Sequence, residues 1–110
     1  MNFQHIAYCS DDGSVLGVLE WREAPGRTFE VHVDVREDQQ RKGIGRRLIV
    51  QLEELVADQE PMSLYTFMAA DNEKAIKFFT GVGFHLYRID NFYGYGRDAY
   101  FGVKPIGTPK

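Results

Sequence analysis

A short basic segment, residues 39–47 (QQRKGIGRR), combines the residue types that hold phosphate groups. Gly43 and Gly45 stand at the start of a run with helical periodicity, where the first backbone N–H groups of the helix have no intrahelical acceptor. Glycine has no β-carbon, so a phosphate can approach those N–H groups closely, and the surrounding basic side chains add positive charge. We therefore predict a pyrophosphate site built on the N–H groups of residues 41–46.

The same spacing excludes the two common nucleotide-binding loops. The segment lacks the G-x-x-x-x-G-K-[ST] pattern of P-loop proteins, and it lacks the third glycine of the dinucleotide fingerprint. We therefore expect neither a nucleoside triphosphatase nor a Rossmann dehydrogenase.

A second group of chemically capable residues lies just upstream. Residues 28–35 (TFEVHVDV) alternate strictly, which places Glu30, His32 and Asp34 on one face of a predicted strand. Carboxylates accept protons, and an imidazole, with a reference pKa of about 6.5, is suited to that task near neutral pH. The same pattern also fits an ordinary solvent-facing strand face, and both interpretations remain open. If the face holds a general base, Glu30 is the first choice and His32 the second.

Hydrophobic periodicity defines the elements that must hold these groups. Strands are predicted at residues 3–8, 15–22, 28–35, 62–69, 84–89 and 98–103, and helices at 44–57 and 71–84. A helix joins the third strand to the fourth, so these two strands should be parallel. The predicted fold class is α/β (α+β), with a mixed, mostly antiparallel sheet that has a central parallel pair and is flanked by helices.

Composition limits the classes of function. The 110 residues predict a single domain, 1–110, with a frayed tail at 104–110. A net charge of −3 gives no general basic field for nucleic acid, and no segment is apolar for the roughly 20 residues that a membrane helix needs. The single cysteine, Cys9, fits a reducing cytoplasm, and the widely separated histidines, together with the lack of a clustered cysteine set, predict no metal site.

The two motifs together resemble those of the GNAT superfamily of acyl-CoA-dependent N-acetyltransferases. Residues 40–45 (QRKGIG) resemble the family's Q-x-x-G-x-G pyrophosphate motif. Residues 72–84 (NEKAIKFFTGVGF) resemble its N-x-x-A-x-x-[hydrophobic]-Y-x-x-x-G-F signature. The resemblance covers Phe3 to Val103 and implies the GNAT acyltransferase fold. Family members usually begin with a strand and two helices, and by this resemblance we expect the sequence to start at the hairpin that follows them.

The resemblance implies acetyl-CoA as cosubstrate, with no metal, and an amine that attacks the thioester directly. The end of the third strand would bind the pantetheine arm and the thioester carbonyl, the glycine segment would hold the pyrophosphate, and the second helix would complete the cleft. The implied cofactor-binding residues are Val33, Asp34, Val35, Gln40, Arg41, Lys42, Gly43, Ile44, Gly45, Arg46, Asn72, Phe78 and Phe79.

One departure from the family concerns the general acid. Phe79 occupies the position where the family commonly carries a tyrosine, and phenylalanine has no proton to donate. Loss of general acid help can cost on the order of 100-fold in rate. Tyr93, Tyr65 or Tyr95 could take the role.

The C-terminal part of the sequence indicates which residues would contact the acceptor amine. The segment RIDNFYGYGRDAYFGV resembles the closing hairpin of members that acetylate protein N-termini, and Phe92 and Tyr93 would flank the acceptor. We expect transfer to a primary amine, with a peptide or protein amine slightly ahead of a small amine. A second subunit, as in a homodimer, could supply the wall that the missing N-terminal elements form in relatives. Two alternatives stay open: a non-catalytic acyl-CoA-binding sensor or interaction module, and a structural sheet without a ligand.

Overall fold

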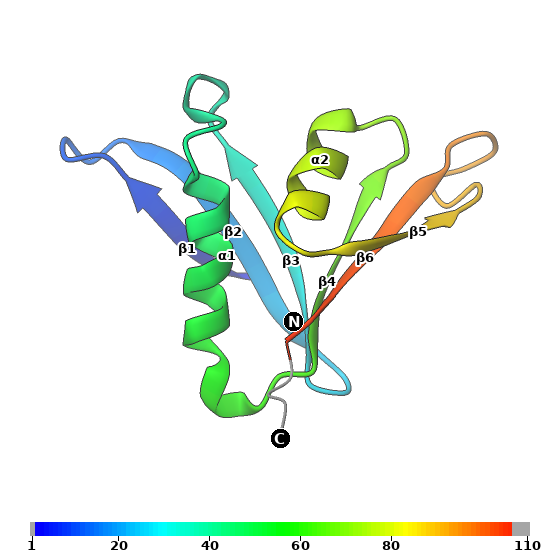
Figure 1. Cartoon of the computed structure of the whole chain (residues 1–110), viewed down its shortest axis with the longest axis horizontal. Helices are drawn as coiled ribbons and strands as arrows, with labels where there is room; N and C mark the ends of the chain where they lie inside the picture. Colours follow the sequence, from blue (N-terminus) through cyan, green and yellow to red (C-terminus); the bar gives the residue numbers. More distant parts are fainter. Residues whose placement is uncertain (1, 107–110) are drawn as a thin grey trace.

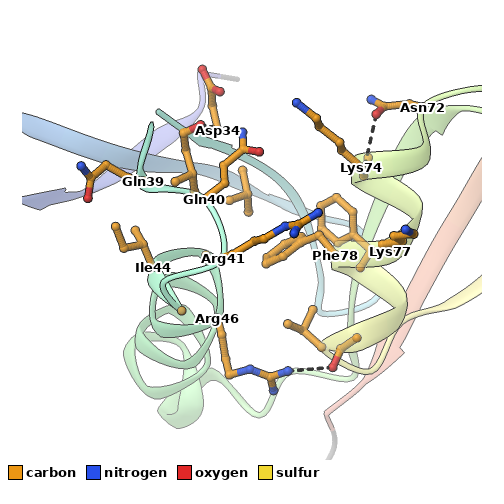
Figure 2. Close-up of a pocket in the computed structure, with 18 residues that line it drawn as sticks. Asp34, Gln39, Gln40, Arg41, Ile44, Arg46, Asn72, Lys74, Lys77 and Phe78 are labelled. Atoms are coloured by element: carbon orange, nitrogen blue, oxygen red, sulfur yellow. Dashed lines mark hydrogen bonds between the residues drawn. The ribbon is translucent and has the colours of Figure 1, made fainter. Parts of the chain in front are cut away.

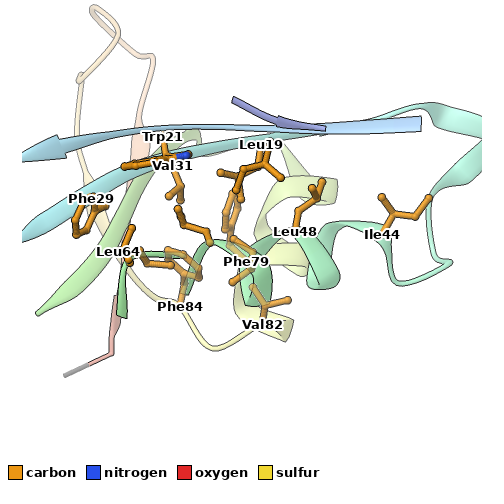
Figure 3. Close-up of a cluster of buried hydrophobic side chains, with 14 of the residues drawn as sticks. Leu19, Trp21, Phe29, Val31, Ile44, Leu48, Leu64, Phe79, Val82 and Phe84 are labelled. Carbon is orange, nitrogen blue, oxygen red and sulfur yellow. The ribbon is translucent and has the colours of Figure 1, made fainter. Parts of the chain in front are cut away.

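The computed structural model describes residues 2–106, which form a six-stranded sheet with two α-helices packed on one of its faces (Figures 1 and 3). The strands are β1 (Gln4–Cys9), β2 (Val15–Ala24), β3 (Thr28–Val35), β4 (Ser63–Ala69), β5 (His85–Ile89) and β6 (Ala99–Pro105). The helices are α1 (Ile44–Leu55) and α2 (Glu73–Gly81), and short 3₁₀ turns occupy Glu37–Gln39 and Ala57–Gln59.

The sheet has the order β1-β2-β3-β4-β6-β5. β3 and β4 pair in parallel, and every other neighbouring pair is antiparallel. The predicted mixed sheet with a central parallel pair is therefore confirmed. The last two strands are reversed in space relative to the chain, because β6 lies against β4 and leaves β5 at the edge.

The element boundaries differ from the sequence prediction mainly at two ends. β2 continues to Ala24, and β6 continues through Lys104 and Pro105, which the sequence assigned to a frayed tail. Lys104 Nζ lies 2.6 Å from Glu53 Oε2, and the N–H of Ile106 donates to the carbonyl of Met62. These contacts hold residues 104–106 against the body of the protein, while residues 107–110 of the predicted tail lie outside the described residues.

The core lies between the sheet and the two helices (Figure 3). Alternate residues of β2 and β3 point to it, and α1 contributes the apolar stripe that its 3.6-residue period predicts. Trp21 packs edge-on against Phe29 at 5.7 Å between ring centroids. The fully buried members of the core include Leu19, Val31, Leu48, Leu52 and Leu64.

The other side of the sheet, here called the open face, is covered by no helix of the described residues. Strand alternation places on it every residue of even number in β2 and β3 and every residue of odd number in β4 and β6. The side chains used below are Arg22, Ala24, Thr28, Glu30, His32, Ser63, Tyr65, Phe67, Phe101 and Val103.

β3 and β4 are paired only at their first residues. The register joins Thr28 to Ser63, Phe29 to Leu64 and Glu30 to Tyr65, and no later pair follows. Beyond these pairs the two strands diverge in a V (Figure 1). We call the gap between β3 residues 31–35 and β4 residues 66–69 the wedge.

Truncating a core residue of α1 should destabilise the fold. Leu48 is fully buried, so Leu48→Ala should lower the free energy of unfolding by about 2–5 kcal/mol, through lost burial and a residual cavity. Leu55→Ala makes the same change at a residue of α1 that is 54% exposed, and should cost less than about 0.5 kcal/mol. Urea unfolding checks both values, and equal losses would contradict this placement of the core.

Candidate functional site

A cavity of about 540 Å³ lies where the end of β3, the loop before α1 and one side of α2 meet (Figure 2). It contains most of the residues that the sequence implied for a cofactor. Its lining comprises Val33, Asp34, Val35, Gln39, Gln40, Arg41, Gly43, Ile44, Gly45, Arg46, Asn72, Lys74, Ala75, Lys77, Phe78, Phe79, Gly81 and Val82. Lys42, which the sequence also implied, is not among them.

The start of α1 presents free hydrogen-bond donors to this cavity. Gly43 caps the helix with φ 81°, a left-handed conformation that favours glycine, and no side chain caps this end. The first helical hydrogen bond runs from the N–H of Arg47 to the carbonyl of Gly43. The N–H groups of residues 44–46 therefore have no intrahelical acceptor, and the positive end of the helix dipole points toward the cavity.

Gly45 has a packing role that the sequence did not reveal. A β-carbon on Gly45 would lie 2.5 Å from Cε1 and 2.8 Å from Cζ of Phe78, which is shorter than any real contact. The ring of Phe78 occupies that space and brings α2 against the first turn of α1. The absence of a side chain at this position is therefore required by the contact between the helices.

The basic side chains of the cavity come from both walls. Arg41 extends from the loop toward α2 in Figure 2, whereas Arg46 donates to the carbonyl of Gly81 at 2.9 Å and so ties α1 to the end of α2. Lys74 and Lys77 line the opposite wall. Sequence reasoning missed these two lysines, although their three-residue spacing on a predicted helix was the available signal.

The backbone of β3 offers hydrogen-bonding groups to the wedge. The N–H of Arg36 donates to the carbonyl of Leu16, and the register then places the even residues of β3 in hydrogen-bonded pairs with β2. The N–H and C=O groups of Val33 and Val35 consequently face the wedge, and the Gln40 side-chain amide donates to the Val35 carbonyl at 3.1 Å. The backbone of Asp34 turns the other way, toward β2, in contrast to the sequence-based expectation that it faces a cofactor.

The remaining implied residues on α2 have structural partners. Asn72 caps the helix, because its Oδ1 accepts the N–H of Ala75 at 3.2 Å. Phe79 is 5% exposed, and its ring packs against Phe78 at 4.9 Å and Phe84 at 5.0 Å. Phe79 thus reaches the cavity from within the core.

On the open face, the predicted acid–base residues form a connected cluster. Glu30 Oε1 accepts from Arg22 Nε at 3.0 Å, and Oε2 lies 2.8 Å from Nε2 of His32. The Phe3 ring lies under the Arg22 guanidinium and edge-on to His32, and the β2–β3 register places Glu20 opposite His32. The sequence placed Glu30 on a polar face, yet its side chain is buried in this cluster.

The cluster determines the charge of Glu30. Burial raises the pKa of Glu30, but hydrogen bonds from His32 and Arg22 outweigh it, so the pKa lies below its ordinary value. The carboxylate is therefore ionised at neutral pH. Its pairing stabilises the fold fully above the ordinary glutamate pKa of about 4.3, and this stabilisation is lost as the pH falls through the lowered pKa.

The aromatic residues of the open face form a continuous wall beside this cluster. Burial, together with the charge of Glu30, raises the pKa of Tyr65. Phe92 lies flat on Phe67 at 4.9 Å, with 10° between the ring planes, and Tyr93 packs edge-on against Phe92. Neither Tyr93 nor Tyr95, which is 98% exposed, lines the cavity.

Two absences hold for residues 2–106. No three histidine, cysteine or acidic side chains gather there as a metal would require. No helix in that range has the length and apolar character to cross a membrane.

Comparison with known proteins gives a family match. Residues 2–84 match the Acetyltransferase (GNAT) family, a range that includes both motifs described above. No match was found among curated proteins.

Solved structures with the same fold include three acetyltransferases. They are the ribosomal-protein-S18-alanine N-acetyltransferase of Escherichia coli (TM-score 0.79, 20% identity, 99% of this chain and 72% of the other), an aminoglycoside 6′-N-acetyltransferase complexed with coenzyme A (0.81, 17%, 96% and 74%), and a protein from Bacillus anthracis assigned as a streptothricin acetyltransferase, in complex with acetyl coenzyme A (0.86, 15%, 96% and 64%). At these identities the likeness concerns the fold, and this chain spans 64% to 74% of their lengths.

Adding a methyl group at Gly45 should disrupt the contact between the helices. We expect Gly45→Ala to lower the free energy of unfolding by about 1–3 kcal/mol, because Phe78 must move. Gly81→Ala is the matched control, since a β-carbon at Gly81 has no neighbour within 4 Å. Urea unfolding of Gly45→Ala combined with Phe78→Ala should recover part of the loss, and strictly additive losses would refute the contact.

Proposed function

The chain belongs to the Acetyltransferase (GNAT) family, and from this premise we propose that it is an acetyl-CoA-dependent N-acetyltransferase that acetylates a primary amine. The observation that carries the proposal is the junction of the wedge with the start of α1. Free backbone groups of a strand and free N–H groups of a helix open into one cavity there. The strand groups suit an amide-containing arm, and the N–H groups of the helix suit a pyrophosphate.

The cavity fits this cosubstrate in its chemistry. The N–H groups of residues 44–46 and the Arg41 guanidinium would hold the pyrophosphate, with Lys74 and Lys77 across the cavity as further cations. The groups of Val33 and Val35 would bind the pantetheine arm in the manner of a neighbouring strand. The apolar side of Phe78 would line the arm.

Transfer requires an uncharged amine. The amine nitrogen forms a bond to the acetyl carbon, the carbon–sulfur bond breaks, and the sulfur leaves with the bonding electron pair. One proton must leave the ammonium before attack, and the nitrogen loses a second proton as the amide forms. The thiolate of coenzyme A takes up one proton after it leaves, so one proton in total is released to solvent. Acetyl-CoA, when bound, supplies the activated acyl group, and the protein supplies position and proton transfer.

His32 is the better candidate for the proton acceptor. Both carboxylate oxygens of Glu30 are engaged and its pKa is lowered, so it is a weak base at neutral pH. His32 is 40% exposed at its side chain and is the first open-face residue beyond the last β3–β4 pair. Glu30 would orient the imidazole, and Arg22 would hold Glu30.

The departing sulfur has no evident proton donor on α2. Phe79 occupies the relevant position within the core, and a thiol with a reference pKa of about 8.5 can leave as a thiolate at reduced rate. The same residue favours the second candidate, a non-catalytic acyl-CoA-binding module. An activity measurement distinguishes the two candidates, because an N-acetyltransferase releases coenzyme A when an amine is added and a binding module does not. Tyr93, an earlier candidate for the acid, belongs to the loop over the open face.

The wider setting is also part of the proposal. The acceptor would be a peptide or protein amine or a small amine, with Phe92 and Tyr93 beside it. A homodimer would add a wall to the open face. A cytoplasmic location is supported by the single cysteine, which cannot form an intrachain disulfide.

Binding of acetyl-CoA should depend on one of two adjacent cations. Arg41 lines the cavity, so Arg41→Gln should weaken binding about 10-fold or more, the value of a charge-assisted hydrogen bond. Lys42→Gln removes the same charge from the next residue, which does not line the cavity, and should change affinity by no more than about threefold. Isothermal titration calorimetry measures all three proteins. A folded parent that fails to bind acetyl-CoA would overturn the proposed function.

Removing the proposed base should slow transfer. With one amine as substrate, His32→Gln should lower kcat/KM about 100-fold, because the new side chain cannot take a proton from the ammonium. Glu30→Gln keeps the imidazole and changes only its hydrogen-bond partner, so it should lower kcat/KM by a smaller factor. Urea unfolding controls for folding. An unchanged kcat/KM in His32→Gln would refute the assignment.

A further inference from the structure

The open face carries a hollow of about 320 Å³ that is separate from the cofactor cavity. It lies over the paired ends of β3 and β4 and extends to β6 and to the end of β2. The lining residues are Ala24, Pro25, Thr28, Ser63, Tyr65, Phe101 and Val103, and none of them is charged. Such a lining suits an apolar group.

Two of the lining residues, Tyr65 and Phe101, are aromatic and belong to a larger group of rings. Tyr65 and Phe101 lie 5.8 Å apart with a 38° tilt, and Phe67 packs against both of them. The stack continues to Phe92 and Tyr93 on the loop after β5. Ring faces and edges at this spacing suit a further aromatic ring in an offset or edge-to-face arrangement.

The hollow adjoins the acid–base cluster. Tyr65 lines the hollow and stands directly opposite Glu30 in the β3–β4 register, and Thr28 lines it two residues before Glu30. Two residues of strand span about 7 Å. His32 lies two residues beyond Glu30 on the same face, at the wedge, so about 7 Å of strand separates it from the level of Tyr65 and about 13 Å from Thr28. A molecule with its amine at His32 therefore reaches the Tyr65 side of the hollow when its apolar group is carried on an alkyl chain of about four carbons.

Resting on the transferase activity proposed above, we propose that the acceptor is a primary amine that carries an aromatic or similarly bulky apolar group. The amine lies at the wedge beside His32 and Glu30, and the apolar group fills the hollow between Tyr65 and Phe101. A protonated amine arriving there meets the carboxylates of Glu30 and Asp34 and the faces of the aromatic wall, all of which attract a single cation.

The charges near the wedge argue against a polyamine. Glu30 already pairs with Arg22 and His32, which leaves Asp34 as the acidic side chain of β3 that forms no ion pair within the described residues. The hollow itself offers no carboxylate to a second or third ammonium group. A polycation would leave charge against an apolar surface, and this costs free energy.

Binding of three amines to the protein saturated with coenzyme A tests this assignment. 4-Phenylbutylamine has the aromatic group on a butyl chain, n-butylamine has the same chain alone, and spermidine is the polycation. 4-Phenylbutylamine should bind at least 10-fold more tightly than either of the others, because only its ring buries a large apolar area. It should also shift the backbone amide resonances of residues 26–28, 63–65 and 101–103. Equal affinities, or tighter binding of spermidine, would overturn the assignment.

A variant that fills the hollow provides the matched comparison. Ala24→Phe places a ring in the hollow and should weaken 4-phenylbutylamine binding at least 10-fold without changing acetyl-CoA affinity. Ala7→Phe makes the same change on the exposed edge strand β1 and should leave both affinities unchanged. Loss of 4-phenylbutylamine binding in both variants would refute the location. Failure of the parent to bind acetyl-CoA overturns the proposed function and this assignment together, whereas intact acetyl-CoA binding with no preference among the amines overturns this assignment alone.

Discussion

The incomplete hydrogen-bond ladder between β3 and β4 is the constraint on which the rest of the structure depends. Three residue pairs close the sheet at one end, and past Glu30 and Tyr65 the two strands separate. Backbone groups at such a break must find water or another partner, because an unpaired polar group is costly. The break lies beside the first turn of α1, where N–H groups are also free. Backbone groups of β3 that have no partner in β4 and N–H groups of α1 that have no intrahelical acceptor therefore face the same cavity.

Much of the fold could be predicted from the sequence because its signals are local. Strict alternation in residues 28–35 and the 3.6-residue period from Ile44 to Leu55 both gave the right element, and the helix between β3 and β4 gave the parallel pair. The divergence of these strands and the placement of β6 inside β5 depend on packing between distant segments. No periodicity within either strand encodes such contacts. The extra residues of β6 likewise depend on Glu53 and Met62, which lie far away in the chain.

The site was predictable where a motif fixes backbone geometry, and less so where side chains meet. The glycines and cations of the loop before α1, which the sequence assigned to a cofactor site, line one cavity, apart from Lys42. The packing role of Gly45 could not be predicted from the sequence, because Phe78 is 33 positions away and the contact exists only in the folded chain. In the same way, alternation gave the face on which Glu30 lies, but it could not show that Arg22 and His32 would occupy both of its oxygens.

The short β3–β4 pairing also has a mechanical meaning. Each half of the sheet has three antiparallel strands and one helix, with β1, β2, β3 and α1 on one side and β4, β5, β6 and α2 on the other. Full ladders join the strands within each half, whereas the seam between the halves has three residue pairs, a shared core and the side-chain contacts of the helices. The angle between the halves thus depends largely on side chains packed across the seam, and a chain-like ligand bound along the seam would add contacts to both halves.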